Sequence, residues 1–468
     1  MGISANSKSY LDILYLNRVK DLRLTGLHVS AKDSAVSIYS GTFGHSDLLK
    51  KTPLTKSHRF PAASISKLFT ATRILQLVEQ GSCKLTTTLK DVLPGLKRSK
   101  KIGSVTLEEL LSHSSGMIRD GHDAAYWACL KNFPTVPELA AQVGDGLLKT
   151  TKRPIGYSNF SFAVLGLVIS ELEQASYEES IFRNIIKPLR LSATSFEYDQ
   201  KAITRYAFLA GKFIKLNPSP KNSFNPAAGI ISNPADIHTF LRALFFEKSL
   251  ITSSAILKNL SKGRALIDGS QYSLGCRLYP FGKKYVRSHT GAEIGCYSFA
   301  GACLKTKRTY VSYTSEASDN IIGDPRLACK GLDGFIDLIK ANQINNSQAA
   351  KISVMKSFRI KPGIYRNFFF RMYLYDNGST ILGLPLNSWS PTDAPTRILK
   401  TKEGKLTVNN ATQMLVNDEP VNLAKRGERY SFTVGGHPYF SENEFQKTFS
   451  KLPELLPQKN RPLGRLYS

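Results

Sequence analysis

The strongest helical signal in the chain is PAASISKLFTATRILQLVEQG, residues 61–81. Apolar side chains recur there at the spacing of one helical face, and Gly81 follows as a stop signal. Ser64 and Lys67 are three residues apart at the amino end of this segment, so they share one face of the helix. The pattern predicts a buried helix that presents a serine and a lysine at its start.

This serine and lysine suit nucleophilic catalysis. A serine hydroxyl needs a base beside it, and a lysine whose pKa is lowered by burial and by the helix amino end can serve as that base. The spacing alone carries little weight, because Ser353 and Lys356 share it. The alternative is an ordinary helix cap at Ser64 with a solvated lysine one turn later.

Length and composition indicate an ordinary folded protein of two or three domains. The chain has 468 residues, 42% of them hydrophobic and 21% charged, which excludes a disordered or fibrous chain. Lys and Arg number 63 against 36 Asp and Glu, so the net charge of +27 attracts anionic partners. Because the basic runs lack interleaved aromatic residues, we expect no specific nucleic acid, whereas an anionic polymer stays a candidate partner.

Cysteine spacing and hydropathy bear on the redox state of the thiols and on the cellular location of the protein. No two of the six cysteines have Cys-x-x-Cys spacing, so free buried thiols are expected. The N-terminal residues show no apolar secretory signal, which predicts a cytoplasmic protein, with export to the periplasm or the medium as the alternative. The longest apolar run, residues 160–169, is too short to span a bilayer.

Hydrophobic periodicity and turn residues predict a mixed α and β protein. Thr106 followed by Glu109 forms the pattern of a capping box, which predicts a helix starting there. Other predicted elements are a helix over 10–24, a hairpin of segments 28–30 and 35–39, helices over 161–173 and 235–246, strands between 272 and 313, and a helix over 334–341.

A polar segment divides the chain. Residues 346–352 lie in a run without aromatic residues and are predicted to form a linker. Residues 1–345 would then form a catalytic domain, and residues 353–468, with several strand-like runs, a small all-β sandwich or barrel.

Two further motifs follow the serine and lysine along the chain. Tyr157-Ser158-Asn159 precedes a predicted helix, and His289-Thr290-Gly291 lies between predicted strands. In this order the motifs resemble those of the serine β-lactamase and penicillin-binding-protein superfamily, in the branch of class C β-lactamases, DD-carboxypeptidases and related esterases. Segments 110–117 and 227–236 also resemble that family, and the likeness covers about residues 20–340.

The resemblance implies an α+β, β-lactamase/transpeptidase-like fold, in which an antiparallel sheet is flanked by helices and accompanied by an all-helical region. The C-terminal all-β domain resembles the lipocalin-like domains of some esterase and peptidase members.

The resemblance also assigns roles to the motif residues. Ser64 would attack an acyl carbon, Lys67 and Tyr157 would relay protons, and Tyr157 would protonate the leaving group. Asn159 would hydrogen-bond the substrate and Lys67, while His289 would orient Tyr157 or face a substrate carboxylate.

The oxyanion hole would be formed by the backbone N–H groups of Ser64 and Ala292, with Thr290 and Gly291 on the same substrate-binding strand. Hydrolysis by water would complete a cycle that needs no metal or organic cofactor.

The expected substrate is a small molecule or peptide with an ester or a D-amino-acid amide or peptide bond. DD-carboxypeptidase-like and esterase-like activities compete, β-lactam hydrolysis comes third, and the rival class is a non-catalytic protein that binds an anionic polymer. If His289 meets a carboxylate in its charged form, turnover should fall as the pH rises through about 6–7. Glu293 is expected near the mouth of the cleft, His113 is expected to be structural, and His122-Asp123 a surface pair.

Overall fold

The computed structural model describes residues 3–96, 101–120, 125–128, 132–143, 156–209, 212–218, 220–260, 263–265, 270–315 and 324–340, and short segments between 363 and 444. Backbone contacts divide the chain into two compact units, Met1–Ile3 with Arg18–Asp333 and Ser4–Asn17 with Gly334–Ser468. The predicted linker, residues 346–352, lies outside the described residues. A boundary there, between a catalytic domain 1–345 and an accessory domain 353–468, remains a proposal.

A large sheet forms the centre of the first unit. Its nine described strands run in the order β3-β2-β1-β13-β12-β11-β10-β9-β8, and adjacent strands pair antiparallel. The strands are β1 (Gly26–Asp33), β2 (Val36–Asp47), β3 (Thr52–Pro53), β8 (Arg264–Ala265), β9 (Gln271–Ser273), β10 (Cys276–Phe281), β11 (Lys284–Glu293), β12 (Cys296–Cys303) and β13 (Arg308–Ser315).

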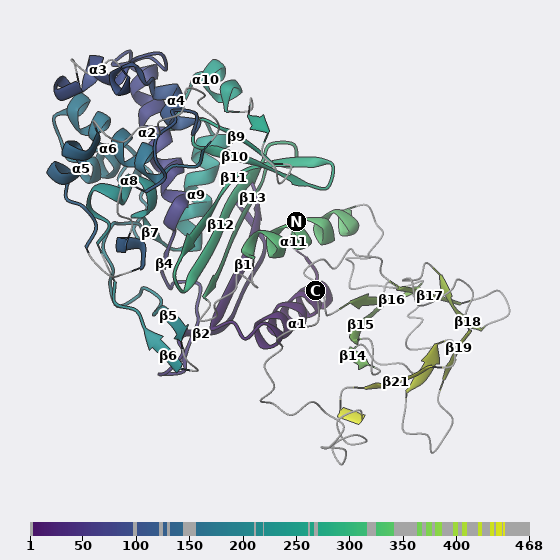
Figure 1. Cartoon of the computed structure of the whole chain (residues 1–468). Coiled ribbons are helices and arrows are strands. Elements are labelled where there is room, and N and C mark those ends of the chain that lie inside the picture. Colours follow the sequence, from purple (N-terminus) through teal and green to yellow (C-terminus); the bar gives the residue numbers. More distant parts are fainter. Residues whose placement is uncertain are drawn as a thin grey trace. The chain divides into compact units, whose positions relative to one another are not determined.

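Helices accompany this sheet and form a separate helical region beside it (Figure 1). They are α2 (Ser66–Glu79), α3 (Leu89–Val92), α4 (Leu107–Leu111), α5 (Val136–Gln142), α6 (Asn159–Glu173), α7 (Tyr177–Ile181), α8 (Asn225–Ala228), α9 (Pro234–Phe245) and α10 (Ser254–Asn259). Two small strand pairs, β4 (Phe60–Pro61) with β7 (Ile231–Ser232) and β5 (Tyr206–Leu209) with β6 (Lys212–Lys215), complete the unit. The expected α+β fold is confirmed.

The core joins helix α2 to helix α9 and to the sheet. Phe69 of α2 stacks on Phe240 of α9 with ring centroids 3.9 Å apart, and both side chains are fully buried. Helix α9 packs on strands β12 and β13. The apolar face predicted for residues 61–81 is therefore the face that fixes α2 in the core.

Local signals account for several helix starts. The capping box predicted at Thr106 and Glu109 is present, because each side chain accepts the other residue's backbone N–H, at 3.2 and 2.9 Å. Helix α6 begins at Asn159, two residues before the predicted start, because the Ser158 hydroxyl caps it by accepting the Ser161 N–H. Ser64 lies in a 3-10 turn, Ala63–Ile65, immediately before α2.

Two helices straddle the division into units. Helix α1 spans Ala5–Asp21, where the sequence predicted residues 10–24, and α11 spans Pro325–Lys340, where it predicted residues 334–341. None of the described helices is long and apolar enough to cross a membrane. The described cysteines, Cys83, Cys276, Cys296, Cys303 and Cys329, are buried, and no disulfide joins any two of them, as expected.

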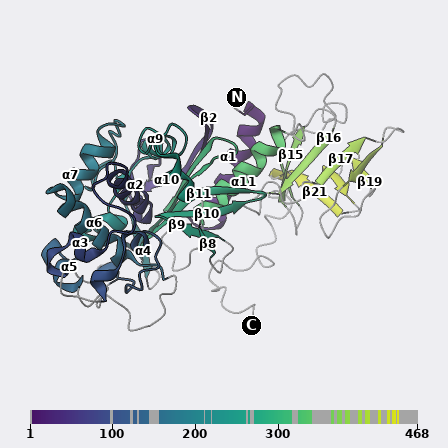
Figure 2. The same cartoon turned by 90° about the horizontal axis from the view of Figure 1, so that it is seen from above.

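In the second unit, eight described strands close into an antiparallel barrel in which each strand pairs with its neighbours in sequence (Figure 2). This up-and-down order is the one that the lipocalin-like expectation requires. The strands are β14 (Gly363–Arg366), β15 (Arg371–Asp376), β16 (Thr380–Pro385), β17 (Thr396–Lys400), β18 (Leu406–Asn409), β19 (Pro420–Leu423), β20 (Phe432–Val434) and β21 (His437–Ser441).

Candidate active site

A cleft of about 780 Å³ opens between the helical region and the sheet of the first unit. Ser64 lies in its wall together with Tyr157 and Asn159 of the second motif and Thr290 of the third. The other lining residues are His113, Arg119, Asp120, Trp127, Tyr272, Arg277, Ala292, Glu293, Ile294 and Tyr297. Three motifs that are far apart in sequence therefore meet at one concave surface.

The turn that carries Ser64 lies directly against strand β11. Ala63 holds a positive φ of 47°, an uncommon conformation for a residue with a side chain. A Cβ atom on Gly291 would lie 2.3 Å from the Ala62 carbonyl oxygen and 2.2 Å from the Ser298 hydroxyl. Glycine is needed at position 291 because the strand and the serine turn are in contact there.

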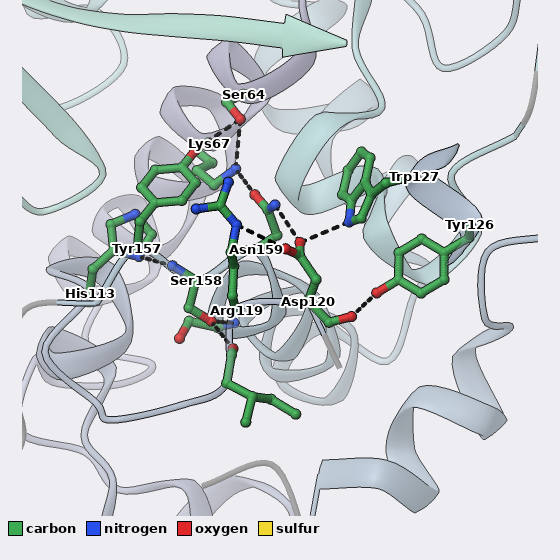
Figure 3. Close-up of polar contacts among 12 residues, drawn as sticks. Ser64, Lys67, His113, Arg119, Asp120, Tyr126, Trp127, Tyr157, Ser158 and Asn159 are labelled. Carbon is green, nitrogen blue, oxygen red and sulfur yellow. Dashed lines mark hydrogen bonds and ion pairs between the residues drawn. The ribbon is translucent and has the colours of Figure 1, made fainter. Parts of the chain in front are cut away.

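Lys67 is fully buried beside Ser64. Its Nζ lies 3.0 Å from the Ser64 hydroxyl and 2.6 Å from the Asn159 side-chain oxygen (Figure 3). It also lies 2.8 Å from the Ala227 carbonyl oxygen. Gly166 of α6 allows α8 to approach, since a Cβ there would lie 2.3 Å from Pro226, the neighbour of Ala227. The lysine is therefore held by contacts from three helices or turns.

This environment favours the neutral amine. Burial lowers the pKa of Lys67 well below its usual range, while the nearby Asp120 raises it and Arg119 lowers it. The oxygens of Asn159 and Ala227 can only accept, so they take two lysine hydrogens. A neutral Lys67 then has its lone pair at the Ser64 hydroxyl, which is the geometry of a general base.

Tyr157 completes the contacts of the serine. Its hydroxyl donates to the Ser64 oxygen at 2.9 Å, and Lys67 Nζ lies 5.0 Å from its ring centroid. Burial raises the pKa of Tyr157 above its ordinary value, so the phenol keeps its proton at neutral pH. Ser64 thus lies between a neutral amine and a phenolic donor.

The structure places His289 between the Tyr272 hydroxyl and the Thr290 carbonyl. Its Nδ1 lies 2.6 Å from the Thr290 carbonyl oxygen and its Nε2 3.1 Å from the Tyr272 hydroxyl, while the centroid of its ring lies 6.2 Å from that of Tyr157. Burial, with a contribution from Lys67, lowers the pKa of His289 to about 3. These contacts and burial favour the uncharged imidazole at neutral pH, and the fall in turnover expected between pH 6 and 7 for a charged His289 stays a prediction.

His113 packs against Tyr157. Its ring centroid is 4.4 Å from that of Tyr157 and 4.5 Å from that of Tyr272, and its Nδ1 accepts the Ser158 N–H at 3.2 Å. Its pKa is held well below the usual range by burial and by Lys67. His113 accordingly holds the second motif in place, as a structural residue would.

Four residues of this site, Arg119, Asp120, Trp127 and Tyr272, were not predicted from the sequence. Asp120 accepts from the Asn159 side-chain amide at 2.6 Å and from the Trp127 indole at 2.8 Å, and it forms an ion pair with Arg119 at 3.0 Å (Figure 3). Tyr272, the partner of the third-motif histidine, was missed as well. The segment Leu110–Met117, whose sequence resembles that of the family, ends three residues before Asp120. This resemblance was the one sequence signal near the loop that carries Arg119 and Asp120.

Glu293 lines the cleft, as expected, but its carboxylate is already paired. It lies 2.8 Å from Arg205 and 2.6 Å from Lys221, and its side chain is only 6% exposed. Because two cations neutralise it, this carboxylate adds little negative charge to the cleft. Thr290 and Ala292 also line the cleft, while Gly291 between them is buried against the Ser64 turn.

Metal ligation finds no support in the described residues, which contain no group of three or more His, Cys, Asp or Glu side chains placed to hold an ion. His122 and Asp123 lie outside the described residues.

Comparisons with known proteins agree with this geometry. A family model described as Beta-lactamase matches residues 16–320. Protein flp of Staphylococcus aureus (strain COL) is 26% identical over 200 residues, which are 42% of this chain and 39% of that protein. Penicillin-binding protein 4 of Amycolatopsis lactamdurans is 27% identical over 205 residues, 40% of this chain and 51% of that protein. The matches thus span only about two fifths to half of these curated relatives.

Solved structures show the same fold. The octameric penicillin-binding protein homologue from Pyrococcus abyssi has a TM-score of 0.62 at 18% identity, over 88% of this chain and 95% of that chain. The D-amino acid amidase from Ochrobactrum anthropi SV3 has a TM-score of 0.61 at 19% identity, over 72% and 100%. A class C beta lactamase from Rhodobacter sphaeroides has a TM-score of 0.58 at 17% identity, over 72% and 100%.

Proposed function

The chain belongs to the Beta-lactamase family, and on this premise we propose that it hydrolyses an ester or a D-amino-acid amide or peptide bond through a covalent acyl-enzyme on Ser64. The family and its structural neighbours place the chain in a superfamily of serine hydrolases. The observation that carries the proposal is the convergence of Lys67 Nζ and the Tyr157 hydroxyl on the Ser64 oxygen, at 3.0 and 2.9 Å.

Acylation follows from these contacts. The Ser64 oxygen attacks the substrate carbonyl carbon and forms a C–O bond, while its proton passes to the lone pair of Lys67. The negative carbonyl oxygen is stabilised by the N–H groups of Ser64 and Ala292. Tyr157 donates its proton to the leaving amine or alcohol as the bond to the carbonyl carbon breaks, and Lys67 returns a proton to the phenol.

Deacylation reverses the proton path with water. The neutral Lys67, aided by Tyr157, takes a proton from the water as it attacks the acyl carbon. Ser64 recovers a proton as its bond to that carbon breaks, and the acid product leaves. Asn159 keeps Lys67 aligned through its 2.6 Å contact during both halves of the cycle.

The substrate class is supported by the neighbours and by the charges of the cleft. The structural neighbours include a D-amino acid amidase and, at a TM-score of 0.56 and 23% identity, a D-stereospecific amidohydrolase from Streptomyces sp.. Since His289 is uncharged, a substrate carboxylate would meet Arg119 or Arg277, which line the cleft. These features support amides and esters as substrates and leave β-lactam hydrolysis in third place.

The test is turnover of three probes by the wild type and two serine variants. The probes are p-nitrophenyl acetate and the amides of D- and L-phenylalanine. Ser64→Ala should lower turnover by about 10³-fold or more, because the nucleophile is lost. Ser353→Ala removes the serine of the other Ser-x-x-Lys pattern and should leave turnover unchanged.

The outcomes separate the possible activities. Hydrolysis of the D-amide but not the L-amide would establish the amidase activity, and hydrolysis of the ester alone the esterase activity. Equal rates for Ser64→Ala and the wild type, or no hydrolysis of any probe together with salt-sensitive binding of an anionic polymer, would contradict the proposal.

A further inference from the structure

A loop that none of the three motifs includes reaches the catalytic lysine through Asn159. Asp120 follows Arg119 in this loop, and its side chain is 13% exposed, whereas that of Arg119 is 70% exposed. The Asp120 carboxylate lies on the far side of Asn159 from Lys67 (Figure 3). Hydrogen bonds thus connect Lys67 to the Asp120 carboxylate through the side chain of Asn159.

The loop is fixed against the start of helix α6. The Phe160 N–H donates to the Arg119 carbonyl oxygen at 3.0 Å, and the Ser158 hydroxyl donates to the Ile118 carbonyl oxygen at 2.7 Å. The Gly156 N–H donates to the His113 carbonyl oxygen at 2.9 Å. Asp120 is therefore held at the same helix end that carries Asn159.

Asp120 determines the orientation of the Asn159 amide. A carboxylate oxygen can only accept, so the Asn159 group that faces Asp120 Oδ1 at 2.6 Å must be its NH₂. The Asn159 oxygen is thereby left for Lys67 Nζ. The same Oδ1 atom also accepts from the Trp127 indole at 2.8 Å, which fixes the carboxylate itself.

We propose that Asp120 is a positioning residue for the acyl transfer, because it holds Asn159 with its oxygen toward Lys67. The charges of Asp120 and Arg119 act on Lys67 in opposite directions. This inference rests on the proposed function, because it concerns the base of that reaction. Asp120 acts through Asn159.

The charged groups around Lys67 support this division of roles. Asp120 raises the pKa of Lys67 and Arg119 lowers it, against the larger lowering by burial. His113 and His289 also lie near Lys67, but burial keeps both uncharged at neutral pH. Asp120 and Arg119 therefore shift the pKa of Lys67 in opposite directions.

Two substitutions of Asp120 separate its hydrogen bond from its charge. Asp120→Ala removes the acceptor, frees the Asn159 amide to rotate, and should lower kcat about 10- to 100-fold. Asp120→Asn keeps an oxygen for the two donors that meet at Oδ1, so its plateau kcat should stay within about threefold of the wild type.

The charge is read from the acidic limb of the profile of kcat/KM against pH. Without the negative charge Lys67 loses its proton more readily, so both Asp120 variants should move this limb to lower pH by on the order of one unit. Arg119→Gln should move it to higher pH. Trp127→Phe removes one hydrogen-bond donor to Asp120 without changing the charge, so the acidic limb should stay in place. Glu247→Gln is an acid-to-amide control at an exposed residue paired with Arg242, and it should also leave the acidic limb in place.

A direct titration keeps the two proposals distinguishable. In protein labelled with ¹³C at the lysine side chains, the signal missing from Lys67→Ala reports the protonation of Lys67 without any substrate. A lower titration midpoint in Asp120→Asn and a higher one in Arg119→Gln would support the inference even if no probe is hydrolysed. Unmoved midpoints, or an active Asp120→Ala with the wild-type kcat, would overturn it and leave the proposed function standing.

Discussion

Addition of one methyl group at Gly291 tests whether the contact between β11 and the serine turn forms the oxyanion hole. A Cβ atom at this position would lie 2.3 Å from the Ala62 carbonyl oxygen and 3.1 Å from the Ala63 Cβ, whereas ordinary contacts begin near 3.4 Å. To accommodate the methyl group, the strand and the turn must separate by about 1 Å.

That separation acts on the two N–H groups assigned to the oxyanion. They belong to Ser64 on the turn and to Ala292, which follows Gly291 on the strand. Loss of one such donor costs about 10²- to 10³-fold in kcat. Overpacking at a buried site costs about 1–3 kcal/mol of unfolding free energy. We therefore expect Gly291→Ala to fold, with a lower melting temperature and kcat reduced about 100-fold.

The assay is steady-state hydrolysis of p-nitrophenyl acetate together with urea unfolding. Gly95→Ala is the matched control, because apart from its own chain neighbours no described atom lies within 4 Å of a Cβ built on Gly95. It should keep the wild-type kcat. A kcat for Gly291→Ala within threefold of the wild type would refute the assignment of the oxyanion hole to this contact.

Three further predictions concern protons and buried charge. Tyr157→Phe removes the donor to Ser64 and should slow the acylation burst by about 10²- to 10³-fold in stopped-flow measurements, and an unchanged burst rate would exclude the phenol as proton donor. His289 has a pKa of about 3 when folded and 6.5 when unfolded, so the unfolded state takes up the proton first and the wild type loses stability as the pH falls below 6.5. His289→Gln should lose about 2–4 kcal/mol less between pH 7 and pH 4 in urea unfolding, whereas equal losses would show that His289 is protonated in the fold. Arg73→Met leaves the Glu173 carboxylate buried without this partner, at 8% exposure, and should lower the free energy of unfolding by about 3 kcal/mol, an effect that adding Glu173→Gln should reduce.

The elements that depend on local signals could be predicted from the sequence. The helix after Ser64, the capping box at Thr106 and the strands between residues 272 and 313 depend on spacing and turn residues within short windows. The pairing of β1 with β13 joins residues almost 300 positions apart, and periodicity within a window contains no information about such a partner.

The candidate site divides in the same way. Ser64, Lys67, Tyr157 and Asn159 meet as the resemblance implied. The Tyr272 hydroxyl that holds the His289 ring comes from β9, two strands away in the sheet, and burial then disfavours the charged imidazole. Asp120 lies in no motif. Its proposed role comes from its contact with Asn159, which is 39 positions away in the sequence, so the sequence alone did not identify it.

The most direct test of the central claim is the intact mass of the protein over time after addition of a penicillin or, separately, p-nitrophenyl acetate. The wild type should gain the mass of one acyl group, located by fragmentation on the peptide that contains Ser64, and Ser64→Ala should gain none. A mass gain of equal size and rate in Ser64→Ala, or an adduct on any other residue, would contradict an acyl-enzyme on Ser64.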